Sequence, residues 1–74
     1  MPSVPRLSCR DIVRAFENLG WTIRKNSTHV IMIKEGHRAT LSIPNHHEVA
    51  RGTLRSLIRD ADVTVEEFLR AAEH

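Results

Sequence analysis

The sequence predicts an α+β domain in which helices cover one face of a three-stranded antiparallel sheet, in the order α-β-β-β-α-α. Apolar residues recur at helical spacing in residues 9–19 and again in residues 54–72, and the stretch between them alternates or is rich in β-branched residues. The links between the strand-like runs are too short for parallel crossovers, so the strands are expected to be antiparallel. The 74 residues are expected to form one domain over residues 1–74, with residues 1–6 flexible.

The first helix is expected from Cys9 to Leu19. Ser8, followed three residues later by Asp11, resembles a capping box in which an aspartate replaces the usual glutamate or glutamine. Gly20 can adopt the left-handed conformation that often ends a helix. The apolar side chains that define this amphipathic helix are Ile12, Val13, Phe16 and Leu19.

Two strands are expected after this helix. Trp21–Lys25 alternates, which places Trp21 and Ile23 on one face and Thr22 and Arg24 on the other. Thr28–Lys34 is rich in β-branched residues and apolar on both faces, which is typical of a central strand. The large side chains of Phe16 and Trp21 are expected in the core.

A tight hairpin turn at Glu35–Gly36 is expected to lead into a third strand, Arg38–Ile43. Its inward-facing residues would be Ala39, Leu41 and Ile43. Pro44 has no backbone N–H to donate, so it is expected to end the strand.

Two further helices are expected after the polar loop Asn45–Glu48. The first is defined by the apolar stripe Leu54, Leu57, Ile58 and Ala61. Thr64–Glu67 forms a capping box that begins a short last helix. Its apolar residues are Phe68, Leu69 and Ala72.

The composition narrows the class of protein. The net charge is +2 and the pI is about 9.3, which permits nucleic-acid binding without requiring it. One Trp, two Phe and no Tyr argue against a platform on which bases stack. The single Cys9 excludes an internal disulfide, and no run is long and apolar enough for a membrane span or a signal peptide. We therefore expect a cytoplasmic protein that does not bind a membrane.

Metal and cofactor sites are not expected. The sequence has no glycine-rich phosphate loop, no cysteine cluster and no HExxH. Its acidic residues lie mostly at expected helix caps and helix surfaces, whereas metal-dependent nucleases gather several carboxylates around their ions. His46 and His47 are adjacent, and adjacent residues seldom both reach one ion in good geometry.

His29 is the main candidate for catalysis. Histidine can take and give a proton near neutral pH, and cleavage of RNA through its own 2′-OH needs a base, cations and an acid. His29 follows a cluster of cations and hydroxyls in which Lys25, Ser27 and Thr28 could hold a phosphate. The alternative is that His29 only begins a strand and the charges around it are solvated.

The remaining histidines are weaker candidates. His46 could supply a second proton-transfer group, although it and His47 could equally be polar loop residues. His37, beside the turn, and His74, at the terminus, are expected on the surface.

The second helix carries a cationic stripe. Arg51, Arg55 and Arg59 lie at i, i+4 and i+8, opposite the apolar stripe of the same helix. Such a row fits the phosphates of RNA or an acidic partner, but it could also be an ordinary solvated face. Gly52–Thr53 would add free backbone N–H groups that favour an anion.

Five segments, in order and with compatible spacing, resemble the HicA-type toxins. They are residues 8–21 with Leu19-Gly20-Trp21, Ser27-Thr28-His29, Ile43-Pro44-Asn45-His46, Arg51-Gly52-Thr53-Leu54-Arg55-Ser56-Leu57-Ile58-Arg59, and residues 62–69. The most specific parts are the strand histidine and the Gly-Thr-Leu helix start. The resemblance implies a fold like that of double-stranded-RNA-binding domains, ribonuclease activity on mRNA that arrests translation, and neutralisation by a HicB-type antitoxin protein.

The resemblance also implies roles for two histidines. The family's catalytic histidine corresponds to His29, and its second, loop histidine corresponds to His46. One position departs from the family, because Ser27–Thr28 stands where Gly-Ser is common. A serine would strain the turn if that position required a positive φ.

Residues and resemblance together predict a metal-independent endoribonuclease toxin without a cofactor. His29 would transfer the proton, Lys25, Ser27 and Thr28 would position the phosphate, and the arginine stripe would steer the RNA. Two alternatives stay open. A non-catalytic RNA-binding module would keep the arginine stripe without needing His29, and a protein-interaction domain would use the second apolar face of the central strand.

Overall fold

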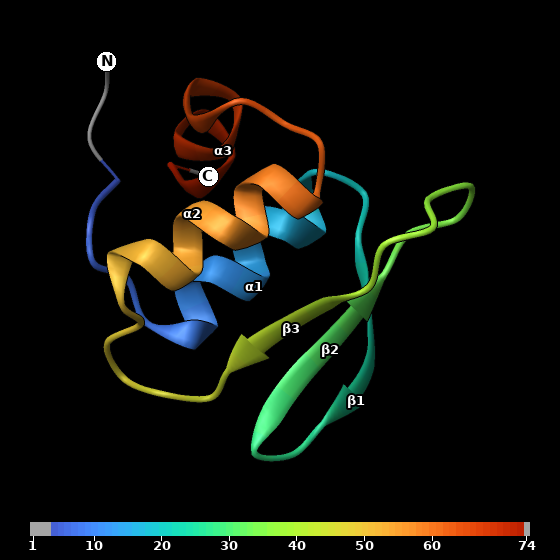
Figure 1. Cartoon of the computed structure of the whole chain (residues 1–74), viewed down its shortest axis with the longest axis horizontal. Coiled ribbons are helices and arrows are strands. Elements are labelled where there is room, and N and C mark those ends of the chain that lie inside the picture. Colours follow the sequence, from blue (N-terminus) through green and yellow to red (C-terminus); the bar gives the residue numbers. More distant parts are fainter. Residues whose placement is uncertain (1–3, 74) are drawn as a thin grey trace.

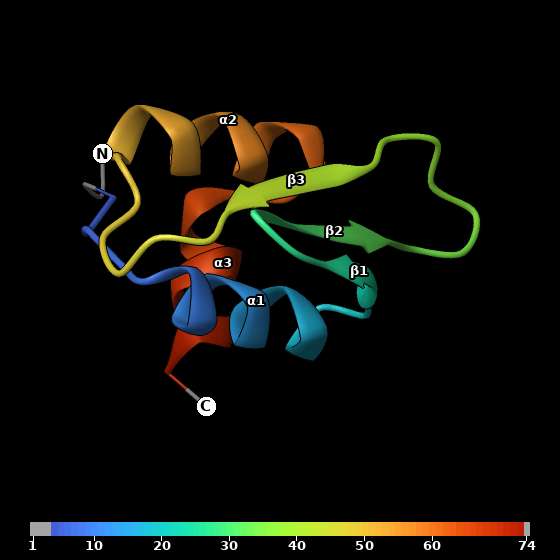
Figure 2. The same cartoon turned by 90° about the horizontal axis from the view of Figure 1, so that it is seen from below.

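The computed structural model describes residues 4–73, which form a sheet layer and a helix layer (Figure 1). The elements are α1 (Cys9–Asn18), β1 (Thr22–Asn26), β2 (His29–Ile33), β3 (Leu41–Pro44), α2 (Arg51–Asp60) and α3 (Val65–Ala72). The strands are antiparallel in the order β1-β2-β3, and the helices lie to one side of the sheet (Figure 2). The expected α+β class, element order and sheet are confirmed, and they are compatible with a fold like that of double-stranded-RNA-binding domains.

The helix ends largely follow the sequence signals. The Ser8 hydroxyl accepts a hydrogen bond from the Asp11 backbone N–H (3.1 Å), and Leu19 is the C-cap of α1, before Gly20 at φ +99°. The full capping box is formed at α3, where the side chains of Thr64 and Glu67 each accept a backbone N–H of the other (3.0 and 2.9 Å).

The core lies between the two layers. Phe16 is fully buried and contacts the rings of Trp21 and Phe68, with centroids 6.3 and 5.1 Å apart. The inward residues of β2 and β3 and the expected stripe of α2 are also buried: Val30, Met32, Leu41, Ile43, Leu54, Leu57, Ile58 and Ala61. Burying a side chain of this size contributes about 1.5–3 kcal/mol, so this layer dominates the stability of the chain.

β1 departs from regular alternation. It begins at Thr22, and all five of its residues are exposed. Trp21 is 1% exposed whereas Ile23 is 43% exposed, so the expectation that the two share a buried face is wrong for Ile23. The reason is that β1 is an edge strand, while the helices pack mainly against β3.

A β-bulge in β1 changes which side chains face outward. Ile23 pairs with Met32 and Lys25 pairs with Ile31, so Arg24 is the extra residue. Without the bulge Lys25 would face the helices. With it, Lys25 shares the outer face of the sheet with Ile31.

The connection from β2 to β3 is longer than expected. A turn around Glu35–Gly36, with Gly36 at φ +80°, is closed by a hydrogen bond from the His37 N–H to the Lys34 carbonyl (3.0 Å). The Ala39 N–H then donates to Nδ1 of His37 (3.3 Å) instead of extending the strand. The expected strand from Arg38 is therefore wrong for residues 38–40, and β3 begins at Leu41.

His37 is not the surface residue that its position suggested. It is partly buried, and its ring lies against Trp21 with centroids 4.9 Å apart. Its imidazole thus stabilises the connection and the edge of the core.

The N-terminal segment and His74 need separate mention. Residues 1–3, half of the expected flexible segment, and His74 lie outside the described residues. Val4 is 1% exposed and joins the core. Within residues 4–73, no helix has both the length and the apolar character needed to cross a membrane.

Candidate functional site

His29 lies at the tip of the β1–β2 hairpin. It is the first residue of β2, pairs with Pro44 of β3, and is exposed. Because the next residue, Val30, points into the core, His29 points to the outer face of the sheet. Its backbone carbonyl accepts the Ser27 N–H (3.2 Å), and within residues 4–73 no hydrogen bond engages its ring.

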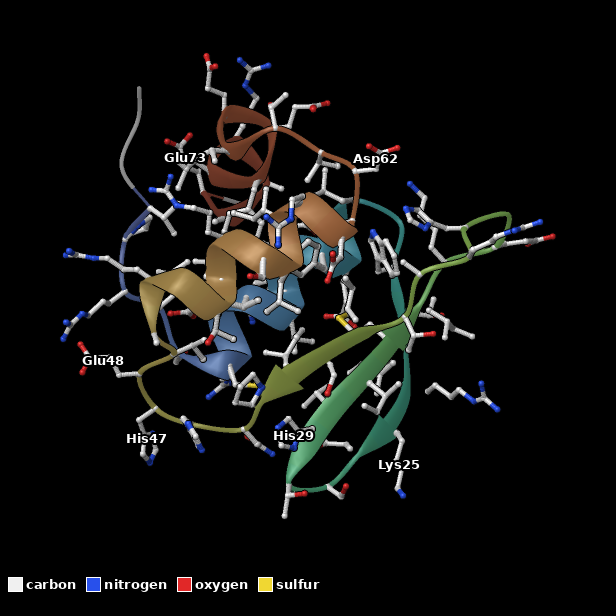
Figure 3. All side chains as sticks on the ribbon, in the orientation of Figure 1. Lys25, His29, His47, Glu48, Asp62 and Glu73 are labelled. Atoms are coloured by element: carbon white, nitrogen blue, oxygen red, sulfur yellow. The ribbon has the colours of Figure 1, made fainter. Side chains whose placement is uncertain are left out.

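The hairpin tip gathers four of the residues expected at the site. Lys25 and His29 lie at the same end of the sheet (Figure 3), and the bulge gives them the same face. Ser27 and Thr28 form the bend between the strands, and both are exposed. Ser27 does not have a positive φ, so the serine that stands where the family commonly has glycine causes no backbone strain.

Asn45 holds the tip in place. Its side-chain NH₂ donates to the Ser27 carbonyl (3.0 Å) and to Oδ1 of Asn26 (3.3 Å). Its backbone N–H donates to the Thr28 carbonyl (3.1 Å). The residue directly after β3 therefore fixes the turn that carries the candidate site.

Sequence reasoning missed this role of Asn45. A signal was available, because asparagine side chains commonly hydrogen-bond backbone groups in turns. Which turn it would reach depends on the sheet topology, since Asn45 and Ser27 are 18 positions apart.

The electrostatic surroundings of the tip are cationic. Between Trp21 and His47 the only acidic residue is Glu35. The basic residues in the same stretch are Arg24, Lys25, Lys34 and Arg38, besides four histidines. An anion approaching the sheet thus meets an excess of positive charge.

His46 lies on the connection from β3 to α2, and so does His47, which Figure 3 labels. The His46 carbonyl accepts the N–H of Cys9 (2.9 Å), which ties this connection to the start of α1. A hollow of about 330 Å³ is lined by this connection and the start of α1, with both histidines in its lining. Among the described residues no hydrogen bond joins His46 to His29, although His46 directly follows Asn45, which is bonded to the tip.

The arginine stripe is exposed along α2. Arg51, Arg55 and Arg59 all face solvent, opposite the buried residues of the helix. The N-cap, Ala50, provides no side-chain cap, so the backbone N–H groups of the first turn are left to solvent or to a ligand. α2 packs on the helix side of β3, so the stripe and His29 do not share a face.

Cys9 and the metal-ligating residue types do not form a site of their own. Burial raises the pKa of the Cys9 thiol, which keeps it protonated and unreactive. In the part of the chain that the structure describes, no group of three or more His, Cys, Asp or Glu residues is arranged to hold a metal ion.

Comparison with known proteins gives one family. A family model described as "HicA toxin of bacterial toxin-antitoxin" matches residues 9–63. This segment runs from the first residue of α1 past the end of α2, and so contains the hairpin tip, Asn45 and the arginine stripe. Neither a curated protein nor a solved structure gives a match.

Proposed function

The chain belongs to the HicA toxin family, and from this premise we propose that it is a metal-independent endoribonuclease that cleaves mRNA and so arrests translation. The family implies an antitoxin partner, and we take that partner to be of the HicB type. The observation that carries the proposal is the exposed His29 at a rigidly held hairpin tip, next to the cation of Lys25 and the hydroxyls of Ser27 and Thr28.

The proposed reaction uses the RNA's own nucleophile. The His29 imidazole removes the proton of a ribose 2′-OH, and the resulting oxygen attacks the adjacent phosphorus. The bond from phosphorus to the 5′-oxygen breaks, which gives a 2′,3′-cyclic phosphate and a 5′-hydroxyl end. Lys25 stabilises the charge that develops on the phosphate, and the hydroxyls of Ser27 and Thr28 orient it.

The proton for the leaving oxygen needs a second donor. His46, which is exposed on the connection that follows β3, is one source, and water is the other. A single histidine would have to accept the proton of the 2′-OH and also donate a proton to the leaving 5′-oxygen, so we expect modest turnover. The arginine stripe binds phosphates of the RNA at a distance from the bond that is cleaved.

The test is cleavage of a labelled RNA oligonucleotide by the purified chain, with EDTA present. His29→Ala should lower the rate by about 100-fold or more while RNA binding stays within a few-fold. His47→Ala, another exposed histidine, is the matched control and should cleave like wild type. Wild-type rates for His29→Ala, or cleavage that needs a divalent ion, would contradict the mechanism.

The arginine stripe supports a second candidate, a non-catalytic RNA-binding module. In that case Arg55→Glu should abolish RNA binding, and neither wild type nor His29→Ala should cleave. Retained binding without cleavage, at protein concentrations where the fold is intact, would favour the module over the enzyme.

A further inference from the structure

A groove lies between α1 and the edge strand β1. Its volume is about 300 Å³, and its apolar lining comes from Cys9, Val13, Ile23 and Val30. α1 and β1 lie on one side of the molecule and α2 and β3 on the other (Figure 2). The groove arises because the helices pack mainly against β3, so the inward-facing Ile23 is 43% exposed although its pairing partner Met32 is fully buried.

Two asparagines line the groove together with these apolar residues. Asn26 and Asn45 are joined through the hydrogen bond from the Asn45 NH₂ to Oδ1 of Asn26. The second bond of the Asn45 NH₂, to the Ser27 carbonyl, fixes the orientation of that amide, because its oxygen could not face a carbonyl. Among the described residues, the Asn26 NH₂ and Oδ1 of Asn45 then have no partner. One donor and one acceptor are thus left at the groove.

The exposed rim of the groove carries charge from α1. Arg10 and Arg14 lie at i and i+4, so they project from one face of the helix. Glu17 also lines the groove, one turn further along α1. Two guanidinium groups against one carboxylate favour an anionic ligand, and guanidinium groups suit phosphate oxygens in particular.

These features match an RNA nucleotide better than an apolar ligand. A base that has left its stack has apolar faces, a hydrogen-bonding edge with a donor and an acceptor, and a phosphate on each side. The apolar lining suits the faces, the two amides suit the edge, and the arginines suit the phosphates.

We propose that the groove between α1 and β1 binds one unstacked nucleobase of the RNA, with Arg10 and Arg14 on an adjoining phosphate. This inference rests on the ribonuclease function proposed above. Asn26 faces the groove and His29 faces the outer side of the sheet, three residues further along the chain. An RNA strand with a base in the groove would pass around the tip at Ser27–Thr28 to reach His29. The groove would therefore select the base at a fixed distance from the cleaved bond.

The direct test is a titration followed by amide NMR signals of the full-length His29→Ala variant. Each of the four ribonucleoside 3′-monophosphates is added in turn, and ribose 5-phosphate and inorganic phosphate serve as separate arms. We expect shifts centred on Val13, Asn26 and Asn45, including both side-chain amides, with one base bound most tightly. Phosphate alone should move the signals of Arg10, Arg14 and the other cationic sites, at the tip and on α2, and leave the side-chain amides of Asn26 and Asn45 in place.

Two outcomes overturn the inference. Inorganic phosphate that reproduces the full set of shifts would show an anion site that ignores the base. Nucleotides that shift only signals of α2, or none, would show that the groove is not a binding site.

A pair of matched substitutions localises the effect. Ile23→Trp fills the groove, whereas Ile33→Trp adds the same side chain at a similarly exposed position (38%) on the outer face. Because its indole would occupy the space of the base, Ile23→Trp should weaken nucleotide binding by about tenfold or more, and Ile33→Trp by less than about twofold. Unchanged binding by Ile23→Trp contradicts the inference. If Ile23→Trp fails to fold, Asn26→Ala at an exposed position replaces it and should weaken binding and flatten the base preference.

Cleavage separates this inference from the proposed function. On RNAs randomised around the cleaved bond, wild type should show a preference for one base at one position, and Ile23→Trp should cleave without that preference. If wild type cleaves no RNA, the ribonuclease proposal fails and the titration still decides whether the groove binds nucleotides. If wild type cleaves without preference and nucleotides do not bind, the groove inference fails and the ribonuclease proposal stands.

Discussion

One histidine, His29, begins β2 beside the first turn of the sheet, another, His37, lies in the second connection, and the two are held very differently. His29, at the β1–β2 tip, is exposed, and the turn around it is fixed by hydrogen bonds from Asn45. His37, in the β2–β3 connection, is partly buried, accepts the Ala39 N–H and lies against Trp21. Only at the first connection is the imidazole free for a substrate while its surroundings are fixed. This difference favours His29 over His37 as the catalytic candidate.

Replacing His29 by alanine should reduce cleavage but not stability, and replacing His37 should reduce stability but not cleavage. This is the largest difference that we expect. His29→Ala should lower RNA cleavage by about 100-fold or more and leave the free energy of unfolding within about 0.5 kcal/mol of wild type. His37→Ala should leave cleavage within a few-fold and reduce stability by about 1–2 kcal/mol, because the Ala39 N–H loses its partner and Trp21 loses a contact. Urea unfolding and cleavage kinetics measure both. The comparison fails if His37→Ala is the variant that abolishes cleavage while remaining folded.

Removing the support of the tip should have the next largest effect. Asn45→Ala deletes the two side-chain hydrogen bonds to Ser27 and Asn26 and should lower kcat by about tenfold through misplacement of His29 and the phosphate. Asn45→Asp keeps the size of the side chain but presents a carboxylate to the Ser27 carbonyl, so it should not restore kcat. KM should change less than kcat, since the cations remain. A loss of activity that follows thermal stability alone, with no split between kcat and KM, would assign Asn45 a purely structural role.

The same comparison explains which features could be predicted from the sequence. Helix caps, the inward residues Leu41 and Ile43 of β3, and the exposed arginine stripe depend on residues within a few positions of one another, and these expectations are confirmed. His29 and Lys25 could be proposed as a pair because they lie in one short segment.

The features that were missed depend on contacts between distant residues. The bulge at Arg24, which turns Lys25 to the outer face, is defined by the pairing of β1 with β2. The partly buried His37 depends on Trp21, and the fixed tip depends on Asn45. In each case the local pattern permitted several arrangements, and packing in three dimensions selected one of them.

The two turns should also differ in their tolerance of side chains. Gly36 lies at φ +80°, so Gly36→Ala should cost about 1 kcal/mol, even though no atom lies within 4 Å of an added Cβ. Ser27 needs no positive φ, so Ser27→Gly should cost less than about 1 kcal/mol, through added freedom of the unfolded chain. Denaturant titration of the two variants measures this difference. A larger loss of unfolding free energy for Ser27→Gly than for Gly36→Ala would contradict the assignment of the conformational constraint to Gly36.

The smallest expected effect lies outside both turns, at the cap of α3. It is a dependence of stability on pH that comes from a carboxylate and not from a histidine. Hydrogen bonds from Thr64, backbone first, lower the pKa of Glu67 below its usual value. A carboxylate whose pKa is lower in the folded state stabilises the fold above its unfolded pKa, and this contribution is lost as the pH falls through the folded value. Glu67→Gln keeps the acceptor but removes the charge, so wild type should exceed it slightly in Tm at pH 7 and match it near the acid end of the folded range. A difference in Tm that grew toward acid pH would have the wrong sign for this cap.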